Sequence, residues 1–191
     1  SLRFVAGEEL QAGCISPLPT VSYFFFGGFN QFCSKAMPKK NVLNLLFPKK
    51  SSKATINAIV TNMEHLKDKS LSETKQGKIL EDLQKKLLDI KKTLYGDTKT
   101  QPDPDLCTQI AFEAYKVDLL LVFVTCIDLI GKENAKLVTH IFNNLLKRKS
   151  SGRFPTVEYI CRNTKILDIL MTKYEDSTIS LFCGDMLREC A

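Results

Sequence analysis

The sequence predicts an all-α fold of the armadillo/HEAT type, built from stacked helical repeats. The chain of 191 residues contains only 9 glycines and 7 prolines, a scarcity of breakers that disfavours a turn-rich β architecture. Apolar residues recur at spacings of three and four along most of the chain, which is the period of amphipathic helices. The predicted helices are short and cannot bury their apolar faces alone, so we expect them to stack. A closed bundle of the same helices is the alternative.

Apolar stripes and end signals define the first two predicted helices. Ser72 offers a side-chain oxygen to the exposed amides of the second helix. Gly96 ends that helix because glycine adopts the left-handed conformation without steric cost. The stripe of the first helix contains Ile56, Ile59, Val60, Met63 and Leu66, and that of the second contains Ile79, Leu80, Leu83, Leu87, Ile90 and Leu94.

The middle of the chain predicts a capped helix followed by a buried one. Asp103 and Pro104 have the pattern of an N-cap and a first helical residue, where the missing N–H of proline is not needed. Residues 119–130, capped by Asp118, are apolar almost all round and are therefore expected at the centre of the core. Gly131 is expected to end this helix.

Residues 133–148 predict a strongly amphipathic helix whose outer face is the candidate partner-binding site. Its core-facing residues are Leu137, Val138, Ile141, Phe142, Leu145 and Leu146. Stacked helices present a continuous concave surface to partners, and we expect the polar residues of this helix to contribute to it. These candidate residues are Lys136, His140, Asn143, Asn144, Lys147 and Arg148. The alternative is an ordinary solvated helix face.

The C-terminal part predicts three more helices. A short one starts at Pro155, another covers residues 166–174, and Asp176 or Ser177 caps the last at residues 179–190. Two blocks of three helices, residues 103–148 and 155–190, align roughly with each other. The sequence stops within an apolar helix, so we expect a truncated α-solenoid that lacks a neighbour.

Residues 1–36 differ in composition from everything that follows. The four phenylalanines between residues 24 and 29 show neither a helical nor an alternating period. We expect residues 1–36 to be a non-native or disordered leader, and residues 37–191 to be the N-terminal part of an armadillo-like helical repeat domain. A signal peptide is the alternative, but Glu8 and Glu9 stand where a basic region is expected.

The net charge of +6 is concentrated in two stretches. Residues 37–53 hold five lysines and no acid, and residues 147–153 hold four basic residues and no acid. Such runs are typical of a solvated leader and a basic loop. RNA binding through them is the alternative.

The seven cysteines show no CxxC spacing and fit a reducing compartment better than a disulfide framework. We therefore expect a cytoplasmic protein. Cys107, Cys126, Cys161 and Cys183 lie among apolar residues and are expected to be buried packing residues. We expect no metal site, no cofactor and no catalysis, because no phosphate-binding glycine loop, nucleophile elbow or histidine beside a nucleophile is present. The longest apolar run, residues 119–127, is shorter than the roughly 20 residues of a membrane span.

Four motifs along the chain carry a resemblance to a known family. They are LYG at residues 94–96, IFNNLLKR at 141–148, PTVEYIC at 155–161 and CGDMLREC at 183–190. Met37, Pro38, Phe47, Tyr174 and Glu175 fit the same pattern. From Met37 onward, the sequence thus resembles the calcium-binding protein 39 family of scaffolds.

This resemblance implies a curved armadillo-like rod that binds protein kinases without being an enzyme. Family members hold a STRAD-type pseudokinase in an active-like shape and so activate liver kinase B, and they stimulate germinal-centre kinases. Family chains are longer, and their pocket for a short hydrophobic peptide from the pseudokinase tail lies in the part that is missing here. No calcium site is expected, because Asp103-Pro104-Asp105 lacks the glycine turn of an EF-hand.

Three functions remain open at this point. The first is a scaffold that binds the active kinase arrangement more tightly and so shifts its population. The second is a helical-repeat RNA-binding protein that uses its basic stretches on phosphate. The third is an inert truncated product that exposes its last apolar helix.

Overall fold

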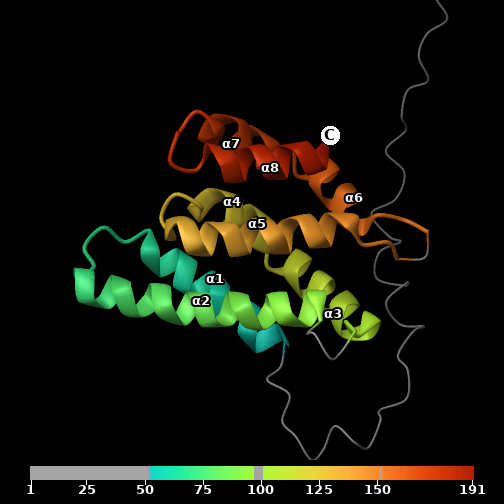
Figure 1. Ribbon diagram of the computed structural model, residues 1–191, viewed down its shortest axis with the longest axis horizontal. Helices are drawn as coiled ribbons and strands as arrows, with labels where there is room; N and C mark the ends of the chain where they lie inside the picture. Colours follow the sequence, from blue (N-terminus) through green and yellow to red (C-terminus); the bar gives the residue numbers. More distant parts are fainter. Residues whose placement is uncertain (1–51, 97–100, 151) are drawn as a thin grey trace, which may run out of the picture. The chain divides into compact units, whose positions relative to one another are not determined.

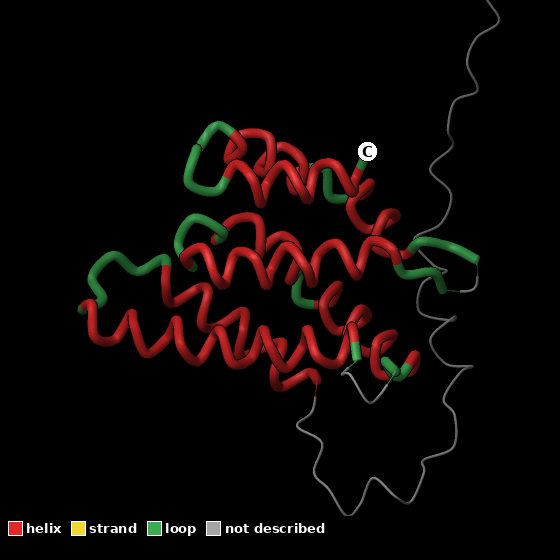
Figure 2. The backbone as a smooth tube through the Cα atoms, in the orientation of Figure 1, coloured by secondary structure: helices red, strands yellow, loops and turns green. Residues whose placement is uncertain are grey.

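A computed structural model describes residues 52–96, 101–150 and 152–191, and within them the chain forms eight α-helices and no β-strand (Figures 1 and 2). The helices are α1 Ser52–Leu66, α2 Glu73–Tyr95, α3 Pro104–Lys116, α4 Leu119–Cys126, α5 Gly131–Lys147, α6 Pro155–Arg162, α7 Lys165–Tyr174 and α8 Ser180–Cys190. The predicted all-α fold class is confirmed. The expected leader, residues 1–36, lies outside the described residues.

The helices pack in two rows with a period of three. In the first row α5 contacts α2 on one side and α8 on the other, and Figure 1 shows these three helices in successive layers. In the second row α4 lies between α1 and α7. The remaining helices, α3 and α6, meet through the rings of Tyr115 and Tyr159, which stack with centroids 5.3 Å apart. The blocks α3–α5 and α6–α8 therefore pack with the same order of helices, in agreement with the predicted alignment.

The core is centred on α4 and α5, as the apolar character of residues 119–130 predicts. The fully buried residues of these two helices include Leu119, Leu120, Phe123, Val124, Val138, Ile141, Phe142 and Leu145. Burial of each large apolar side chain contributes about 1.5–3 kcal/mol relative to leaving it in water. Apolar burial is thus the main source of stability for this fold.

Two predicted helix ends are confirmed by their hydrogen bonds. The Asp103 carboxylate accepts bonds from the backbone N–H of Asp105 at 3.0 Å and of Leu106 at 3.5 Å, so it caps α3. Gly96 has a φ of 76° and donates its N–H to the carbonyl of Lys92 at 2.9 Å, which closes the last turn of α2. A residue with a Cβ would be strained at this φ.

Three predicted caps are wrong in their side-chain role. Ser72 occupies the N-cap position of α2, but its hydroxyl pairs with that of Thr74 and makes no cap hydrogen bond. Asp118 precedes α4 in the left-handed region, and its carboxylate instead accepts a bond from the Tyr159 hydroxyl at 2.6 Å. Asp176 accepts bonds from the N–H and hydroxyl of Thr178 in the turn before α8, so it does not cap that helix. In each case the side-chain oxygen bonds to another group instead of to a free amide of the helix.

The predicted end of the fourth helix at Gly131 is also wrong. Helix α4 ends at Cys126, and Gly131 is the first residue of α5, with a φ of 73°. Ile127 and Ile130 remain buried in the turn between the two helices. The apolar pattern therefore continues past the helix end, because the turn itself packs into the core.

The prediction of buried cysteines holds for Cys107, Cys126 and Cys183, but Cys161 is exposed. Helix α6 is short, and Thr156 and Ile160 are its buried residues. Cys161 follows Ile160 directly, and neighbouring residues on a helix point about 100° apart, so its thiol turns away from the core.

Replacement of Leu87 by alanine tests the packing of α2 into the core. Leu87 is 0% exposed, so Leu87→Ala should lower the free energy of unfolding by about 2–5 kcal/mol through a cavity. The matched control is Leu181→Ala on α8, where the side chain is 72% exposed, and the expected change is within about 0.5 kcal/mol. Urea-induced unfolding followed by circular dichroism measures both. Equal losses would contradict this packing.

Replacement of Asp103 by alanine tests the cap of α3. Asp103→Ala removes two bonds to helix amides and should lower the free energy of unfolding by about 1 kcal/mol. Ser72→Ala is the control, because the Ser72 side chain makes no cap bond, and its expected effect is a few tenths of a kcal/mol or less. The same unfolding measurement compares them, and a larger loss for Ser72→Ala would refute the assignment.

Candidate partner-binding surface

Helix α5 exposes only a narrow strip, because α2 and α8 cover its two sides. Of the six candidate residues, Lys136 and Lys147 are exposed, whereas His140, Asn143, Asn144 and Arg148 are partly buried. The strip begins in the first half of the helix and runs to its C-terminal end. Exposed residues of α2 and α8 beside this strip would therefore form part of any surface that a partner contacts.

His140 lies where α2, α5 and α8 come together. The Tyr95 hydroxyl donates a hydrogen bond to the backbone oxygen of His140 at 2.9 Å, and the two rings meet edge to face with centroids 6.4 Å apart. Burial lowers the pKa of His140 below its ordinary value of 6.5, the charges of Lys91 and Lys136 lower it further, and Asp185 opposes them. The imidazole is therefore neutral at pH 7 and presents one donor and one acceptor.

We call this surface the ladder face and define it by Lys91 and Tyr95 of α2, Lys136 and His140 of α5, and Asp185 of α8. Tyr95 contacts His140 directly, and Lys91, Lys136 and Asp185 lie close enough to influence the pKa of His140. The ladder face therefore contains residues from each helix of the first row.

Two exposed leucines extend the ladder face with apolar surface. Leu88 lies three residues before Lys91, and Leu181 lies four residues before Asp185. Residues at these spacings share one face of a helix. Beside Leu181 and Asp185, Arg188 forms an ion pair with Asp185 at 2.8 Å. Aromatic residues are enriched at the centre of protein interfaces, whereas charged residues are depleted there and the rim is polar. An aromatic ring flanked by aliphatic and charged side chains fits this pattern.

The C-terminal end of α5 is occupied by internal contacts. Arg148 donates from Nη2 to the backbone oxygen of Leu94 at 2.6 Å and from Nε to Oδ1 of Asn144 at 2.8 Å. The Leu94 carbonyl belongs to the last turn of α2, where helix carbonyls lack partners within the helix. Lys147 forms an ion pair with Glu189 of α8 at 2.9 Å. These contacts give Asn144, Lys147 and Arg148 a role in joining α5 to its neighbours.

Asn143 differs from the other candidates. Its amide oxygen is buried and makes no hydrogen bond within the described residues. Lys136 and His140 are thus the two candidates that the structure places on the ladder face.

The sequence did not predict the residues that α2 and α8 contribute to the ladder face. Tyr95 and Asp185 occur within the LYG and CGDMLREC motifs, and no sequence pattern singles out Lys91 or Leu88. The rough alignment of the two three-helix blocks contained the necessary signal. Equivalent helices of consecutive repeats stack side by side, which places exposed residues of α2 and α8 next to those of α5.

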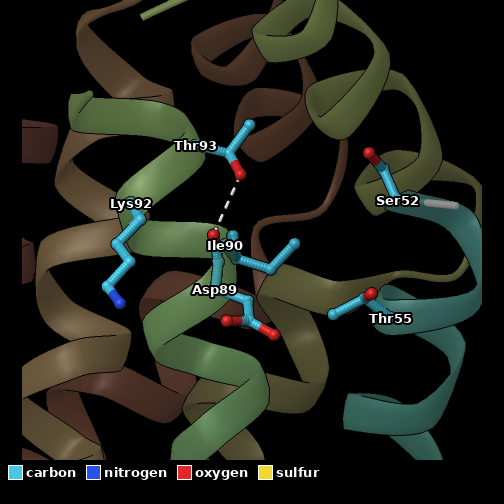
Figure 3. Close-up of a pocket in the computed structure, with 6 residues that line it drawn as sticks. All are labelled: Ser52, Thr55, Asp89, Ile90, Lys92 and Thr93. Carbon is cyan, nitrogen blue, oxygen red and sulfur yellow. Dashed lines mark hydrogen bonds between the residues drawn. The ribbon is translucent and has the colours of Figure 1, made fainter. Parts of the chain in front are cut away.

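A separate hollow of about 300 Å³ lies between the start of α1 and the C-terminal half of α2 (Figure 3). The Thr93 hydroxyl on its wall donates to the backbone oxygen of Asp89 at 2.9 Å. Its lining residues are Ser52, Thr55, Asp89, Ile90, Lys92 and Thr93, and none of them belongs to the ladder face. In the described part of the chain, no three or more His, Cys, Asp or Glu side chains gather in a way that would hold a metal ion.

Comparison with known proteins places this arrangement in a family. The family model described as Mo25-like matches residues 45–191. The chain belongs to the Mo25-like family. Among curated relatives, the human "Calcium-binding protein 39-like" is 41% identical over 116 residues, which are 61% of this chain and 34% of that protein.

Two other Mo25-like relatives come from distant organisms. "MO25-like protein 2" of Caenorhabditis elegans is 38% identical over 118 residues, 62% of this chain and 35% of that protein. The "Mo25-like protein" of Schizosaccharomyces pombe is 28% identical over 151 residues, 78% of this chain and 45% of that protein. The matches thus cover between about a third and a half of these relatives.

In this Mo25-like chain the PTVEYIC motif anchors α6 to the preceding repeat. Thr156 is fully buried and donates from its hydroxyl to the backbone oxygen of Leu145 at 2.7 Å. The hydroxyls of Tyr115 and Thr156 lie 2.6 Å apart, and Tyr159 bonds to Asp118. The motif therefore joins α3, α5 and α6. No helix in the described ranges is both long enough and apolar enough to cross a membrane.

Replacement of Arg148 tests whether its side chain stabilises the contact between α5 and α2. Arg148→Ala removes two charge-assisted bonds and leaves the Leu94 carbonyl without this partner, so the free energy of unfolding should fall by about 2 kcal/mol. Lys136→Ala changes an exposed residue of the same helix, and its expected effect is within about 0.5 kcal/mol. Thermal and urea unfolding measure both variants. An unchanged stability of Arg148→Ala would show that Arg148 is not a structural tie.

Proposed function

We propose that this chain is part of a non-catalytic cytoplasmic scaffold that binds a protein kinase or pseudokinase through the ladder face. The proposed partners are a STRAD-type pseudokinase, its complex with liver kinase B, and germinal-centre kinases. Binding would promote serine/threonine kinase activation in signalling. Membership of the Mo25-like family supports a scaffold role in general, and the ladder face supports the choice of surface.

The observation that carries the proposal is the Tyr95–His140 pair. Tyr95 is 46% exposed although its hydroxyl is already bonded to the backbone of α5. A ring that is held in place loses little conformational freedom when a partner covers it. Tyrosine is among the residues that most often dominate binding energy at protein interfaces. Tyr95 and His140 therefore form a suitable apolar centre for an interface.

The charges around this pair favour a partner with acidic groups. Lys91 and Lys136 both act on His140 from its surroundings, whereas the nearby acid Asp185 is paired with Arg188. Charge complementarity of this kind increases association rate and specificity more than affinity. We therefore expect an acidic or polar rim around an apolar contact on the partner.

A scaffold without catalytic residues can activate a kinase only by preferring one conformation. If it binds the active arrangement more tightly than the inactive one, it shifts the population toward the active form. A tenfold shift requires a difference of about 1.4 kcal/mol in binding free energy. A few well-packed side chains are sufficient for that difference.

Calcium binding is not part of the proposal, although the human relative is named for it. The acidic segment that comes nearest to a calcium loop is Asp103-Pro104-Asp105, and the Asp103 carboxylate there is bonded to the amides of α3. RNA binding is less favoured, because three cations of the basic stretch at residues 147–153 are engaged within the fold. Lys147 pairs with Glu189, Arg153 pairs with Glu158, and Arg148 binds Leu94 and Asn144.

Binding of a purified STRAD-type pseudokinase by this chain tests the surface. We expect Lys136→Glu and His140→Ala each to weaken binding about tenfold or more, as for residues near the centre of an interface, while both variants remain folded. Lys165→Glu on α7 has the same charge change at an exposed site in the other row, and it should bind normally. Isothermal titration calorimetry measures the affinities. Equal affinities for Lys136→Glu, His140→Ala and Lys165→Glu would reject the ladder face as the binding surface.

Kinase activation is tested with a chimera. Residues 45–191 of this chain replace the matching segment of the human calcium-binding protein 39-like protein, and liver kinase B activity is measured with the pseudokinase present. Stimulation that Lys136→Glu lowers would support the proposed function. A folded chimera that neither binds nor stimulates would contradict it. RNA binding that falls steeply with salt would favour the alternative.

A further inference from the structure

Two thiols lie near the C-terminal ends of α6 and α8, away from the ladder face. Cys161 is exposed, whereas Cys190 is partly buried and packs against the core. Neither belongs to the candidate partner-binding residues. The three other free cysteines of the described residues, Cys107, Cys126 and Cys183, are buried. Cys161 is therefore the described cysteine most open to reagents in solution.

The start of α6 and the end of α8 are both tied to the last turn of α5. Glu189, the neighbour of Cys190, forms an ion pair with Lys147 at 2.9 Å. At the start of α6, Thr156 bonds to the backbone oxygen of Leu145 at 2.7 Å. Cys161 lies five residues after Thr156, or about 7.5 Å along the helix axis. Figure 1 shows the chain passing from α5 through α6 beside the C-terminal end of α8.

The electrostatics of Cys190 agree with this proximity. Burial, together with the nearby Glu189 and Cys161, raises the pKa of Cys190 to about 11. The Cys190 thiol is therefore protonated at pH 7. Because thiolates are the form that reacts with peroxides, Cys190 is not the first of the two thiols to be oxidised.

We propose that Cys161 and Cys190 form a redox-active pair that closes to a disulfide when a hydroperoxide oxidises Cys161. In the first step the Cys161 sulfur takes one oxygen from hydrogen peroxide, the O–O bond breaks, and one water leaves with a sulfenic acid on Cys161. In the second step the Cys190 sulfur attacks the Cys161 sulfur. The S–O bond breaks, and the hydroxide takes the Cys190 proton and leaves as a second water. Two thiols are oxidised by two electrons, and one peroxide is reduced to two waters.

The disulfide requires the two Cα atoms to approach within about 4.4–6.8 Å. The part that adapts is the last turn of α6, which ends at Arg162, because terminal turns of helices open at the lowest cost. The closed disulfide ties α6 to α8 and restrains the end of the helix that carries Asp185 and Arg188. Oxidation should therefore raise the melting temperature of the chain.

Peptide mapping of the oxidised chain tests the proposal. The reduced protein is treated with hydrogen peroxide, free thiols are blocked with N-ethylmaleimide, and the protein is digested with trypsin without reductant. Cleavage after Arg153, Arg162 and Arg188 releases Cys161 in peptide 154–162 and Cys190 in peptide 189–191. We expect the main product to be these two peptides joined, with the loss of two hydrogen atoms, and a melting temperature that rises on oxidation and returns with dithiothreitol.

Single variants identify the order of steps. In Cys190→Ser, dimedone should trap the Cys161 sulfenic acid severalfold more than in the unaltered chain, because no second thiol removes it. In Cys161→Ser, Cys190 should stay reduced, and the buried-site control Cys126→Ala should keep the cross-link. The proposal is overturned by a disulfide between two copies of peptide 154–162. It is equally overturned if Cys161 reaches the sulfinic acid while Cys190 remains open to alkylation.

Discussion

Burial of α5 on both sides is the constraint on which the rest of this structure depends. Its apolar residues pack toward α2 on one side and α8 on the other, so it belongs to two interfaces at once. A helix in this position fixes the spacing of the first row, and the short connections of each repeat then bring α1, α4 and α7 into the second row. The same constraint narrows the exposed part of α5 to the strip that carries Lys136 and His140.

The polar contacts between repeats set the register more than they add stability. Tyr95 to His140, Arg148 to Leu94 and Thr156 to Leu145 each join a side chain to a backbone carbonyl of a neighbouring helix. A hydrogen bond of this kind contributes about 1 kcal/mol net, and an exposed ion pair such as Lys147–Glu189 contributes about 0–1 kcal/mol. Apolar burial in the core is much larger in sum. These polar groups would nevertheless be costly to leave unpaired, so they disfavour other alignments of the helices.

Periodicity predicted the helices well because each is amphipathic by itself. The stripe of α2, the cap at Asp103 and the stop at Gly96 depend on residues close in sequence. The predicted cap at Asp118 is wrong because its carboxylate bonds to Tyr159. The predicted burial of Cys161 is wrong because of the orientation of short α6. Only tertiary packing determines both. For the candidate site, the sequence alone predicted Lys136 and His140. Arg148 bonds to Leu94, 54 positions away, and Tyr95 bonds to His140, 45 positions away. No local sequence pattern encodes these contacts.

Hydrogen exchange of backbone amides in the native state tests the central role of α5 most directly. If both neighbouring interfaces depend on α5, the backbone amides of residues 137–146 should exchange only through global unfolding. Under the same conditions α8, which has α5 and α7 as its main neighbours, should open earlier and independently. The denaturant dependence of exchange, resolved by mass spectrometry of peptides, separates these cases. Exchange of α5 through a local opening while α8 remains protected would contradict the account.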